Sequence, residues 1–219
     1  MKVDIREEGI IAILRNIPCN KITSVVQALY DGGIRIAECT FEQEKEGPEE
    51  ILVEKVRILK KHFGDCMMIG AGTVLTENQV EAAHRAGCEL IITPNTDTAV
   101  IKRAKKYSMT TVIGAVTPTE IVQAKEAGAD FVKIFPAGAL GTGYFSAIKA
   151  PLSHIPMLAV GGIGKNDLKS FMKAGAEGFG IGSPLIPRSA VIGGDYNQIK
   201  KLAEDYVQCY KAIKNEMTK

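Results

Sequence analysis

Short apolar runs and longer amphipathic segments alternate along this chain. Runs rich in isoleucine and valine occur eight times, at residues 9–15, 34–41, 67–74, 89–95, 110–117, 130–137, 156–163 and 178–186. Between them lie segments such as 77–87 and 118–128, whose apolar residues recur at the three- and four-residue spacing of a helix. The pattern predicts eight strands that alternate with helices.

Residues that start and stop helices fall between the predicted strands. Helix starts are indicated by Thr76, by Thr117 with Pro118, and by Asn166 with Asp167. Several helices are expected to end at a glycine directly before a strand, because glycine tolerates the left-handed backbone of a helix cap. These glycines are Gly33, Gly87, Gly128 and Gly175. The last segment, residues 196–219, is predicted to form one long closing helix.

Strands that are apolar on both faces indicate a parallel sheet covered by helices. Eight strand–helix units in 219 residues fit the small end of the size range of a (β/α)8 TIM barrel, an α/β fold. An open doubly wound sheet is the alternative, but the glycine signature expected after its first strand is absent from AILRNIPCNK, residues 12–21. We find no linker or change of composition, so we expect a single TIM-barrel domain over residues 1–219.

Composition and charge narrow the class of protein. Hydrophobic residues make up 46% of the chain and charged residues 24%, as in ordinary globular proteins. The formal net charge of +2 is spread along the chain, which argues against nucleic acid as a partner. No apolar run is long enough for a membrane span, the N-terminus lacks a signal peptide, and the five cysteines are widely spaced. We expect a cytoplasmic protein with reduced thiols and no metal site.

Three ionisable residues stand near the ends of predicted strands, where the active sites of such barrels lie. Arg15 ends the first strand, and Glu38 lies within the second. Lys133 interrupts the apolar stretch of the sixth. A strand lysine can instead run along apolar surface to reach water. Three charges at three strand ends are harder to explain without a function, because buried unpaired charge is costly.

These residue types suit one kind of chemistry. A lysine among apolar side chains, near a second cation such as Arg15, is pressed toward its neutral amine. A neutral amine can condense with a ketone to form a Schiff base. Glu38, the one acidic residue well inside a predicted strand, can then move protons on the substrate. The set favours a class I aldolase, which needs no metal or other cofactor.

Glycine-rich sequences end the last two predicted strands. They are VGGIGKND, residues 160–167, and GIGSPLI, residues 180–186. The loops after strands seven and eight of a TIM barrel commonly bind phosphate, together with the N-terminus of a short helix. Backbone N–H groups that no side chain obstructs can surround the phosphate oxygens. The residues alone therefore predict an aldolase that acts on a phosphorylated keto compound.

Motifs along nearly the whole chain resemble those of the 2-keto-3-deoxy-6-phosphogluconate and 4-hydroxy-2-oxoglutarate aldolase family. They are AILR (12–15), ECT (38–40), IGAGTVLTENQ (69–79), IITPN (91–95), FVKIFPA (131–137), LAVGGI (158–163) and GIGS (180–183). The resemblance implies that Lys133 is the Schiff-base lysine and Glu38 the acid/base glutamate. It also implies the remaining contacts: pyruvate with Thr73, Pro94 and Phe135, substrate with Arg15, and phosphate with Gly161, Gly162, Gly182 and Ser183.

The resemblance also implies an activity. We expect cleavage of 2-keto-3-deoxy-6-phosphogluconate, and of 4-hydroxy-2-oxoglutarate, to pyruvate plus glyceraldehyde 3-phosphate or glyoxylate. This reaction belongs to Entner–Doudoroff carbohydrate metabolism, and family members are typically homotrimers. The first alternative is an aldolase for 2-keto-3-deoxy-6-phosphogalactonate. Two others are a barrel that binds a sugar phosphate without turnover, and an isomerase or epimerase that works by proton transfer alone.

Glu42 departs from the family pattern. Phosphogluconate-type members usually have an arginine four residues after the catalytic glutamate, which resembles a clamp for the pyruvate carboxylate, whereas the phosphogalactonate relatives lack it. Here the position is a glutamate in the acidic stretch FEQEKEGPEE, residues 41–50. Charged runs in loops are normally solvated, so we expect Glu42 to face solvent. The alternative is that it contacts the hydroxyl groups of a different sugar acid.

Overall fold

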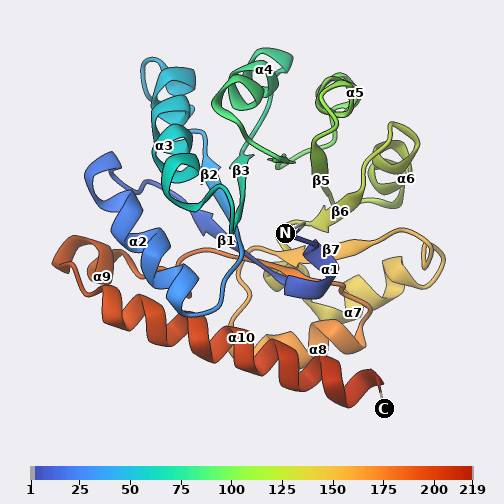
Figure 1. Cartoon of the computed structure of the whole chain (residues 1–219). Helices are drawn as coiled ribbons and strands as arrows, with labels where there is room; N and C mark the ends of the chain where they lie inside the picture. Colours follow the sequence, from blue (N-terminus) through green and yellow to red (C-terminus); the bar gives the residue numbers. More distant parts are fainter. Residues whose placement is uncertain (1–2, 219) are drawn as a thin grey trace.

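The computed structural model describes residues 3–218, in which eight parallel strands close into a barrel surrounded by helices (Figure 1). Each strand pairs with the next, and the first pairs with the eighth, Ile10 opposite Phe179. The strands are β1 (Ile10–Leu14), β2 (Ile36–Thr40), β3 (Met68–Gly72), β4 (Leu90–Ile92), β5 (Thr110–Ala115), β6 (Phe131–Ile134), β7 (Met157–Val160) and β8 (Phe179–Ile181). The predicted (β/α)8 barrel is confirmed. Each strand is shorter than the run that predicts it, because the runs also include loop residues at the strand ends.

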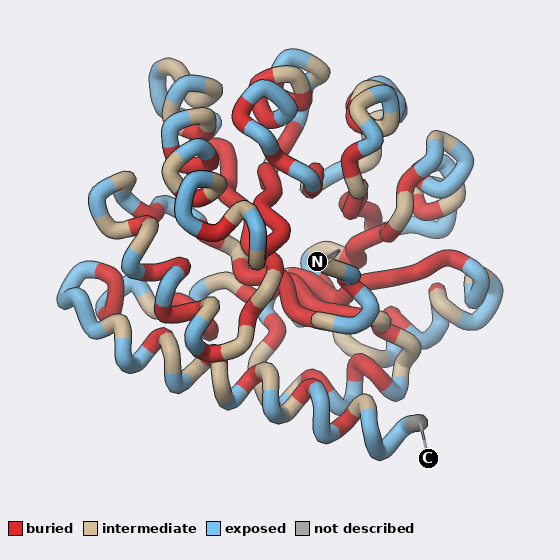
Figure 2. The backbone as a smooth tube through the Cα atoms, viewed as in Figure 1, coloured by how far each residue is buried: buried red, intermediate tan, exposed pale blue. Residues whose placement is uncertain are grey.

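Successive side chains along the strands belong to two separate apolar layers. Ile11 and Phe131 pack inside the barrel, whereas their neighbours Ile10 and Val132 pack between the barrel and the helices. This alternation follows from the two-residue period of a strand. Figure 2 shows the buried strands at the centre and exposed faces on the surrounding helices. The parity of a strand position therefore decides whether its side chain can reach a site inside the barrel.

The helices form the outer ring of the barrel, and the first of them closes its N-terminal end. They are α1 (Ile5–Glu8), α2 (Cys19–Asp31), α3 (Pro48–Phe63), α4 (Glu77–Ala86), α5 (Thr98–Lys106), α6 (Pro118–Glu126), α7 (Ala137–Lys149), the 3-10 helix η1 (Lys165–Asp167), α8 (Leu168–Lys173), α9 (Arg188–Gly193) and α10 (Tyr196–Thr218). The predicted long closing helix is α10.

Most of the predicted helix ends are confirmed. The Thr76 side chain accepts the Gln79 N–H at the start of α4, and Thr117 with Glu120 forms a capping box at the start of α6. The four predicted stop glycines have left-handed φ angles: Gly33, Gly87, Gly128 and Gly175. Asp167 differs, because its carboxylate accepts the Gly164 N–H at 2.8 Å and so caps η1.

The N-terminal end of the barrel is closed by the first helix of the chain. α1, which the apolar pattern does not predict, inserts Ile5 into the interior layer. α10 packs beside it: the Tyr210 hydroxyl donates to the Arg6 carbonyl at 3.3 Å. Gly9 allows this approach, since a Cβ there would lie 2.0 Å from the Tyr210 ring. The first helix therefore closes this end of the barrel, and the last helix of the outer ring packs against it.

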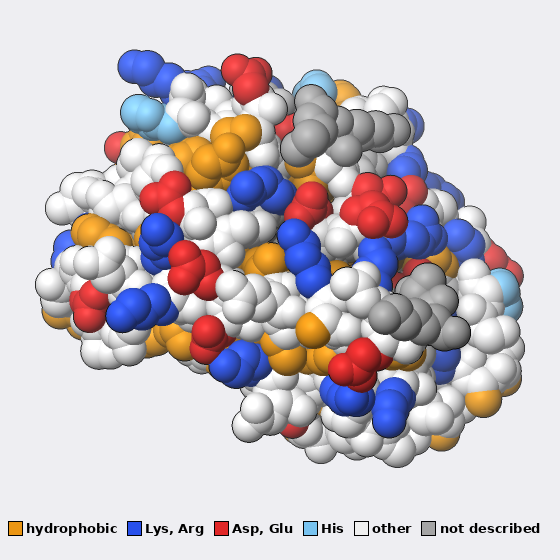
Figure 3. All heavy atoms as spheres, turned by 60° about the horizontal axis from the view of Figure 1, so that its bottom comes forward, with side chains coloured by type: hydrophobic (Ala, Val, Ile, Leu, Met, Phe, Trp, Pro, Cys, Tyr) orange, Lys and Arg blue, Asp and Glu red, His pale blue; other side chains and the backbone are white. Residues whose placement is uncertain are grey.

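The surface charges and the cysteines do not change this description of the fold. On the face shown in Figure 3, basic and acidic side chains are interspersed. No disulfide joins the five cysteines, and burial raises the pKa of Cys39 to about 12, which keeps that thiol protonated. In the described part of the chain, no helix is long and apolar enough to cross a membrane.

Candidate active site

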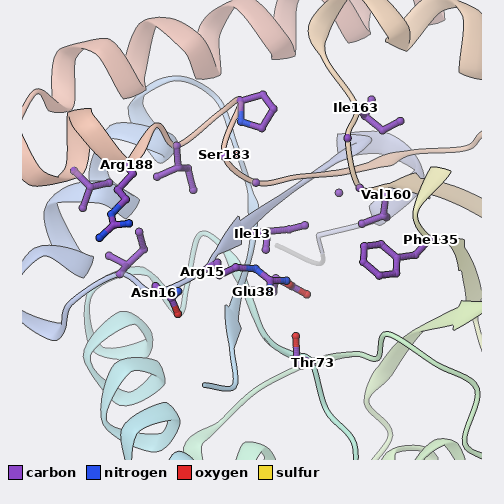
Figure 4. A pocket seen from close by; sticks show the side chains of 18 of the residues that line it. Ile13, Arg15, Asn16, Glu38, Thr73, Phe135, Val160, Ile163, Ser183 and Arg188 are labelled. Atoms are coloured by element: carbon purple, nitrogen blue, oxygen red, sulfur yellow. The ribbon is translucent and has the colours of Figure 1, made fainter. Parts of the chain in front are cut away.

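A cavity of about 590 Å³ opens at the carboxyl ends of the strands (Figure 4). All ten residues that the sequence analysis selects line it: Arg15, Glu38, Thr73, Pro94, Lys133, Phe135, Gly161, Gly162, Gly182 and Ser183. They come from β1, β2, β3, β4, β6, β7 and β8 or from the residues just after these strands. Residues that are far apart in sequence therefore meet in one site.

Lys133 lies inside the barrel and is 7% exposed. It pairs with Gly114 on β5, which has no side chain, and its Nζ lies 5.0 Å from the centroid of the Phe135 ring. An ammonium buried here does not extend along the outer surface to water, so the snorkelling alternative is not what the fold shows. Burial lowers the pKa of Lys133 against the opposing charge of Glu38, and Arg15 adds to the lowering. The site favours the neutral amine.

Glu38 faces the same interior and is 3% exposed. Its carboxyl group packs over Gly72, where an added Cβ would lie 2.4 Å from Glu38 Cδ. Burial raises the pKa of Glu38, while Lys133 and Arg15 oppose that rise. No group in residues 3–218 hydrogen-bonds to Oε2. Because buried carboxylate oxygens normally have partners, an unpaired one is consistent with a catalytic role.

Thr73 and Arg15 lie around the two buried groups. Figure 4 shows the Thr73 side chain directed toward Glu38 and Arg15. Thr73 has a φ of +55°, a left-handed conformation that is an outlier for a β-branched residue. Backbone strain of this kind concentrates at functional sites. Arg15 is exposed at the cavity, and its charge acts on both Glu38 and Lys133.

The two glycine-rich loops form another part of the cavity wall. Gly161 and Gly162 have φ angles of +90° and +72°, which glycine alone adopts readily. A Cβ on Gly161 would also lie 2.9 Å from the Phe135 ring. Gly182 and Ser183 follow β8 on the same wall. This part of the wall is open backbone, a surface suited to an anion.

Two further cations line the cavity and were not selected from the sequence. Arg188 is exposed, and no hydrogen bond or ion pair engages it within the described residues. Lys21 is held in place: its Nζ donates to the carbonyls of Val191 and Ile192 at 2.9 and 2.8 Å. Arg188 could have been selected from the sequence, because it is a basic residue that follows the eighth predicted strand. With Arg15, these cations make the cavity suited to an anionic ligand.

The expectation that Glu42 faces solvent is wrong. Glu42 is 4% exposed and forms ion pairs with Lys55 of α3, which is also buried, and with Lys45. The two lysines take up its carboxylate, which a charge run read along one loop does not reveal. Glu42 does not line the cavity, so the alternative of contact with substrate hydroxyls is not supported either. Thr40 is likewise buried and outside the cavity lining.

Comparisons with known proteins point in one direction. A protein-family model described as "Aldolase: KDPG and KHG aldolase" matches residues 1–202. The chain is 41% identical over 177 residues to "2-dehydro-3-deoxy-6-phosphogalactonate aldolase" of Escherichia coli (strain K12), covering 80% of this chain and 83% of that protein. It is 30% identical over 185 residues to "2-dehydro-3-deoxy-phosphogluconate aldolase" of Treponema pallidum (strain Nichols), covering 84% and 85%. A solved structure described as "Native KDPGal structure" matches with a TM-score of 0.85 and 37% identity, over 94% of this chain and 96% of that chain.

Proposed function

The chain belongs to the KDPG and KHG aldolase family, and on this premise we propose that it cleaves 2-dehydro-3-deoxy-6-phosphogalactonate to pyruvate and glyceraldehyde 3-phosphate. From the sequence alone, the phosphogluconate epimer is the expected substrate and this compound is the first alternative. The comparisons favour the reverse order, since a phosphogalactonate aldolase shares 41% identity with the chain and a phosphogluconate aldolase 30%. The glutamate at position 42 agrees with this order, because the phosphogalactonate relatives lack the arginine found there in phosphogluconate-type members.

One observation carries the proposed class of reaction: a buried lysine and a buried carboxyl group share a cavity lined by further cations. Burial lowers the pKa of Lys133 and raises that of Glu38, so each group is driven toward its neutral form. A neutral amine is the nucleophile that Schiff-base formation requires. A carboxyl group with a raised pKa can exchange protons near neutral pH. Such a pair has no evident use in a barrel that only binds its ligand.

The proposed cycle starts at the C2 ketone. Lys133 Nζ attacks the carbonyl carbon, and loss of water, with a proton from solvent, leaves an iminium ion. The positive charge of the iminium favours the carboxylate form of Glu38, which removes the proton of the C4 hydroxyl group. The C3–C4 bond breaks, and its electron pair moves toward the iminium to form an enamine while the aldehyde departs. The enamine takes the proton from Glu38 at C3, and water hydrolyses the resulting iminium to release pyruvate and the free amine.

Other residues of the cavity suit the two anionic ends of this substrate. We assign the pyruvate carboxylate to Thr73 and the nearby backbone, with Pro94 and Phe135 beside the pyruvate methylene carbon and Arg15 as a substrate-binding cation. We assign the phosphate to the glycine-rich wall, Gly161, Gly162, Gly182 and Ser183. The homotrimer implied by the family resemblance and the cytoplasmic location expected from the composition of the chain remain part of the proposal.

The choice between substrates is tested by assaying both epimers side by side. Purified protein is given either 2-dehydro-3-deoxy-6-phosphogalactonate or the gluconate epimer, and pyruvate release is followed by a coupled lactate dehydrogenase reaction. We expect kcat/KM to be higher for the galactonate compound by at least about tenfold, which one altered contact can supply. Equal values, or a preference for the gluconate epimer, would refute the proposed substrate and leave the aldolase reaction intact.

The covalent step is tested by trapping with pyruvate and borohydride. We expect reduction to attach one pyruvyl group to Lys133, located by peptide mapping, and Lys133→Met to abolish it. Because burial lowers the pKa of Lys133 from 10.5, the neutral amine fraction rises with pH and passes its midpoint below pH 10.5. The trapping rate should follow the same curve. An adduct on another lysine, or none in the unaltered protein, would contradict the Schiff-base mechanism.

A further inference from the structure

The backbone of Thr73 departs from the regular ladder of the barrel. On one side, the Gly72 carbonyl accepts the Phe41 N–H at 2.9 Å, and on the other, the Val74 N–H donates to the Ile92 carbonyl at 3.2 Å. Between these two bonds, Thr73 turns to a φ of +55°. A strained conformation of this kind persists only where its surroundings hold it.

Two glutamine side chains hold this turn. Gln43 Nε2 donates to the Thr73 carbonyl at 2.7 Å and to Gln79 Oε1 at 3.3 Å, and Gln79 Nε2 donates back to Gln43 Oε1 at 2.8 Å. Gln79 Oε1 also accepts the Leu75 N–H at 2.8 Å. The two amides therefore bind the chain at Thr73 and again two residues later. Gln79 is buried on α4, 4% exposed, which gives the pair a fixed base.

The segment that carries Gln43 is itself anchored. Its neighbour Glu42 is buried in the ion pair with Lys55 of α3. The Glu42 carbonyl also accepts the Lys45 N–H at 3.0 Å, which closes a turn around Gln43. Glu42 thus ties the start of the β2–α3 loop to a helix outside the barrel. Gln43 then extends from a fixed backbone across to the loop after β3.

We propose that Gln43 and Gln79 are positioning residues, which hold Thr73 in its left-handed conformation so that its side chain faces Glu38 and Arg15. In this arrangement the Glu42–Lys55 ion pair fixes the loop that presents Gln43. The inference rests on the proposed function, because it is there that Thr73 receives the pyruvate carboxylate. It gives Glu42 a structural role outside the cavity. Phosphogluconate-type members have at this position an arginine that resembles a clamp for the pyruvate carboxylate.

The test uses two substitutions of Gln43, whose side chain is exposed, so that folding is little affected. Gln43→Glu keeps the shape but sets a carboxylate oxygen against the Thr73 carbonyl, and Gln43→Ala removes the side chain. The readout is the pyruvate concentration that half-saturates borohydride trapping of Lys133. We expect it to rise about tenfold in Gln43→Glu and severalfold in Gln43→Ala. The trapping rate at saturating pyruvate and the Tm should change little.

Gln123→Ala, on the exposed face of α6, is the matched control and should behave like the unaltered protein. Unchanged half-saturation in both Gln43 variants would overturn the inference. So would a lowered Tm with equal loss of binding and of rate at saturation, since that pattern indicates a general structural role. If the unaltered protein traps no pyruvate, the proposed function fails and this inference fails with it, an outcome visible before any variant is compared.

Discussion

Replacing Glu38 by glutamine is expected to slow cleavage at least about a hundredfold while pyruvate still forms its adduct on Lys133. Glutamine fills the same space over Gly72 but cannot take the proton of the C4 hydroxyl group. General acid–base catalysis by one side chain contributes roughly 10²–10⁴ in rate. Adduct formation depends mainly on the amine, so the two activities should separate. The measurements are kcat for the phosphorylated substrate and the extent of borohydride trapping.

Glu126→Gln, an exposed carboxyl group on α6, serves as the control and should leave both measurements unchanged. Cleavage at the normal rate in Glu38→Gln would mean that another group carries the proton. Equal losses of cleavage and trapping would instead place Glu38 in the formation of the Schiff base. Either result would change the assignment of Glu38 while leaving that of Lys133 in place.

Replacing Glu42 by glutamine is expected to lower the free energy of unfolding by about 3–5 kcal/mol, the usual cost of breaking a buried ion pair from one side. The substitution leaves Lys55, itself 5% exposed, without its carboxylate. Urea unfolding measures the change, and an unchanged m-value shows that the shift in midpoint reports stability. The surface pair Lys60–Glu89 provides the control, since the Glu89 side chain is about half exposed and Glu89→Gln should cost less than about 1 kcal/mol.

The double variant Glu42→Leu with Lys55→Met separates charge from packing. It removes both ions together, and apolar replacement of a buried pair is often neutral or stabilising. Equal costs for Glu42→Gln and Glu89→Gln would show that the Glu42–Lys55 pair contributes no more than a surface contact. If the double variant regains stability but still binds pyruvate weakly, the ion pair is needed to position Gln43 and not to keep the protein folded.

Acid should weaken the same ion pair. Burial by itself raises the pKa of Glu42, but hydrogen bonds from Lys45 and Lys55 outweigh it and hold the pKa below 4.5. A carboxyl group whose pKa is lower in the folded state stabilises the protein fully above its unfolded value. That contribution is therefore present at neutral pH and is lost as the pH falls below 4.5 and through the folded pKa.

The barrel and much of its cavity follow from local rules that a sequence carries. Two-sided apolar strands, glycine stops such as Gly87 and caps such as Thr76 each depend on near neighbours. The inward direction of Glu38 follows from strand parity, because Cys39 packs on the opposite side against the helices. Once the fold is known, strand ends meet at one mouth, and this is why all ten selected residues line the same cavity.

What the sequence did not reveal depends on contacts between loops and helices. Glu42 reads as solvated beside its acidic neighbours, and only the packing of α3 brings Lys55 to it. The reciprocal bonds of Gln43 and Gln79 join residues 36 positions apart, with no periodicity to indicate them. Arg188 lines the cavity only because of the path that the chain takes after β8. The apolar pattern also missed α1, because four residues are too few to establish a helical period.

The pairing of β1 with β8 has a consequence for how the protein is made. A ribosome delivers the chain from the N-terminus, so β1 leaves the exit tunnel long before its partner around residue 180 exists. Until then the growing sheet has two open edges, and open edges can pair with other chains. The cavity spans this seam, with Arg15 on one side and Gly182 on the other. A functional site can therefore assemble only after nearly the whole chain has been synthesised, and loop closure over that length is costly.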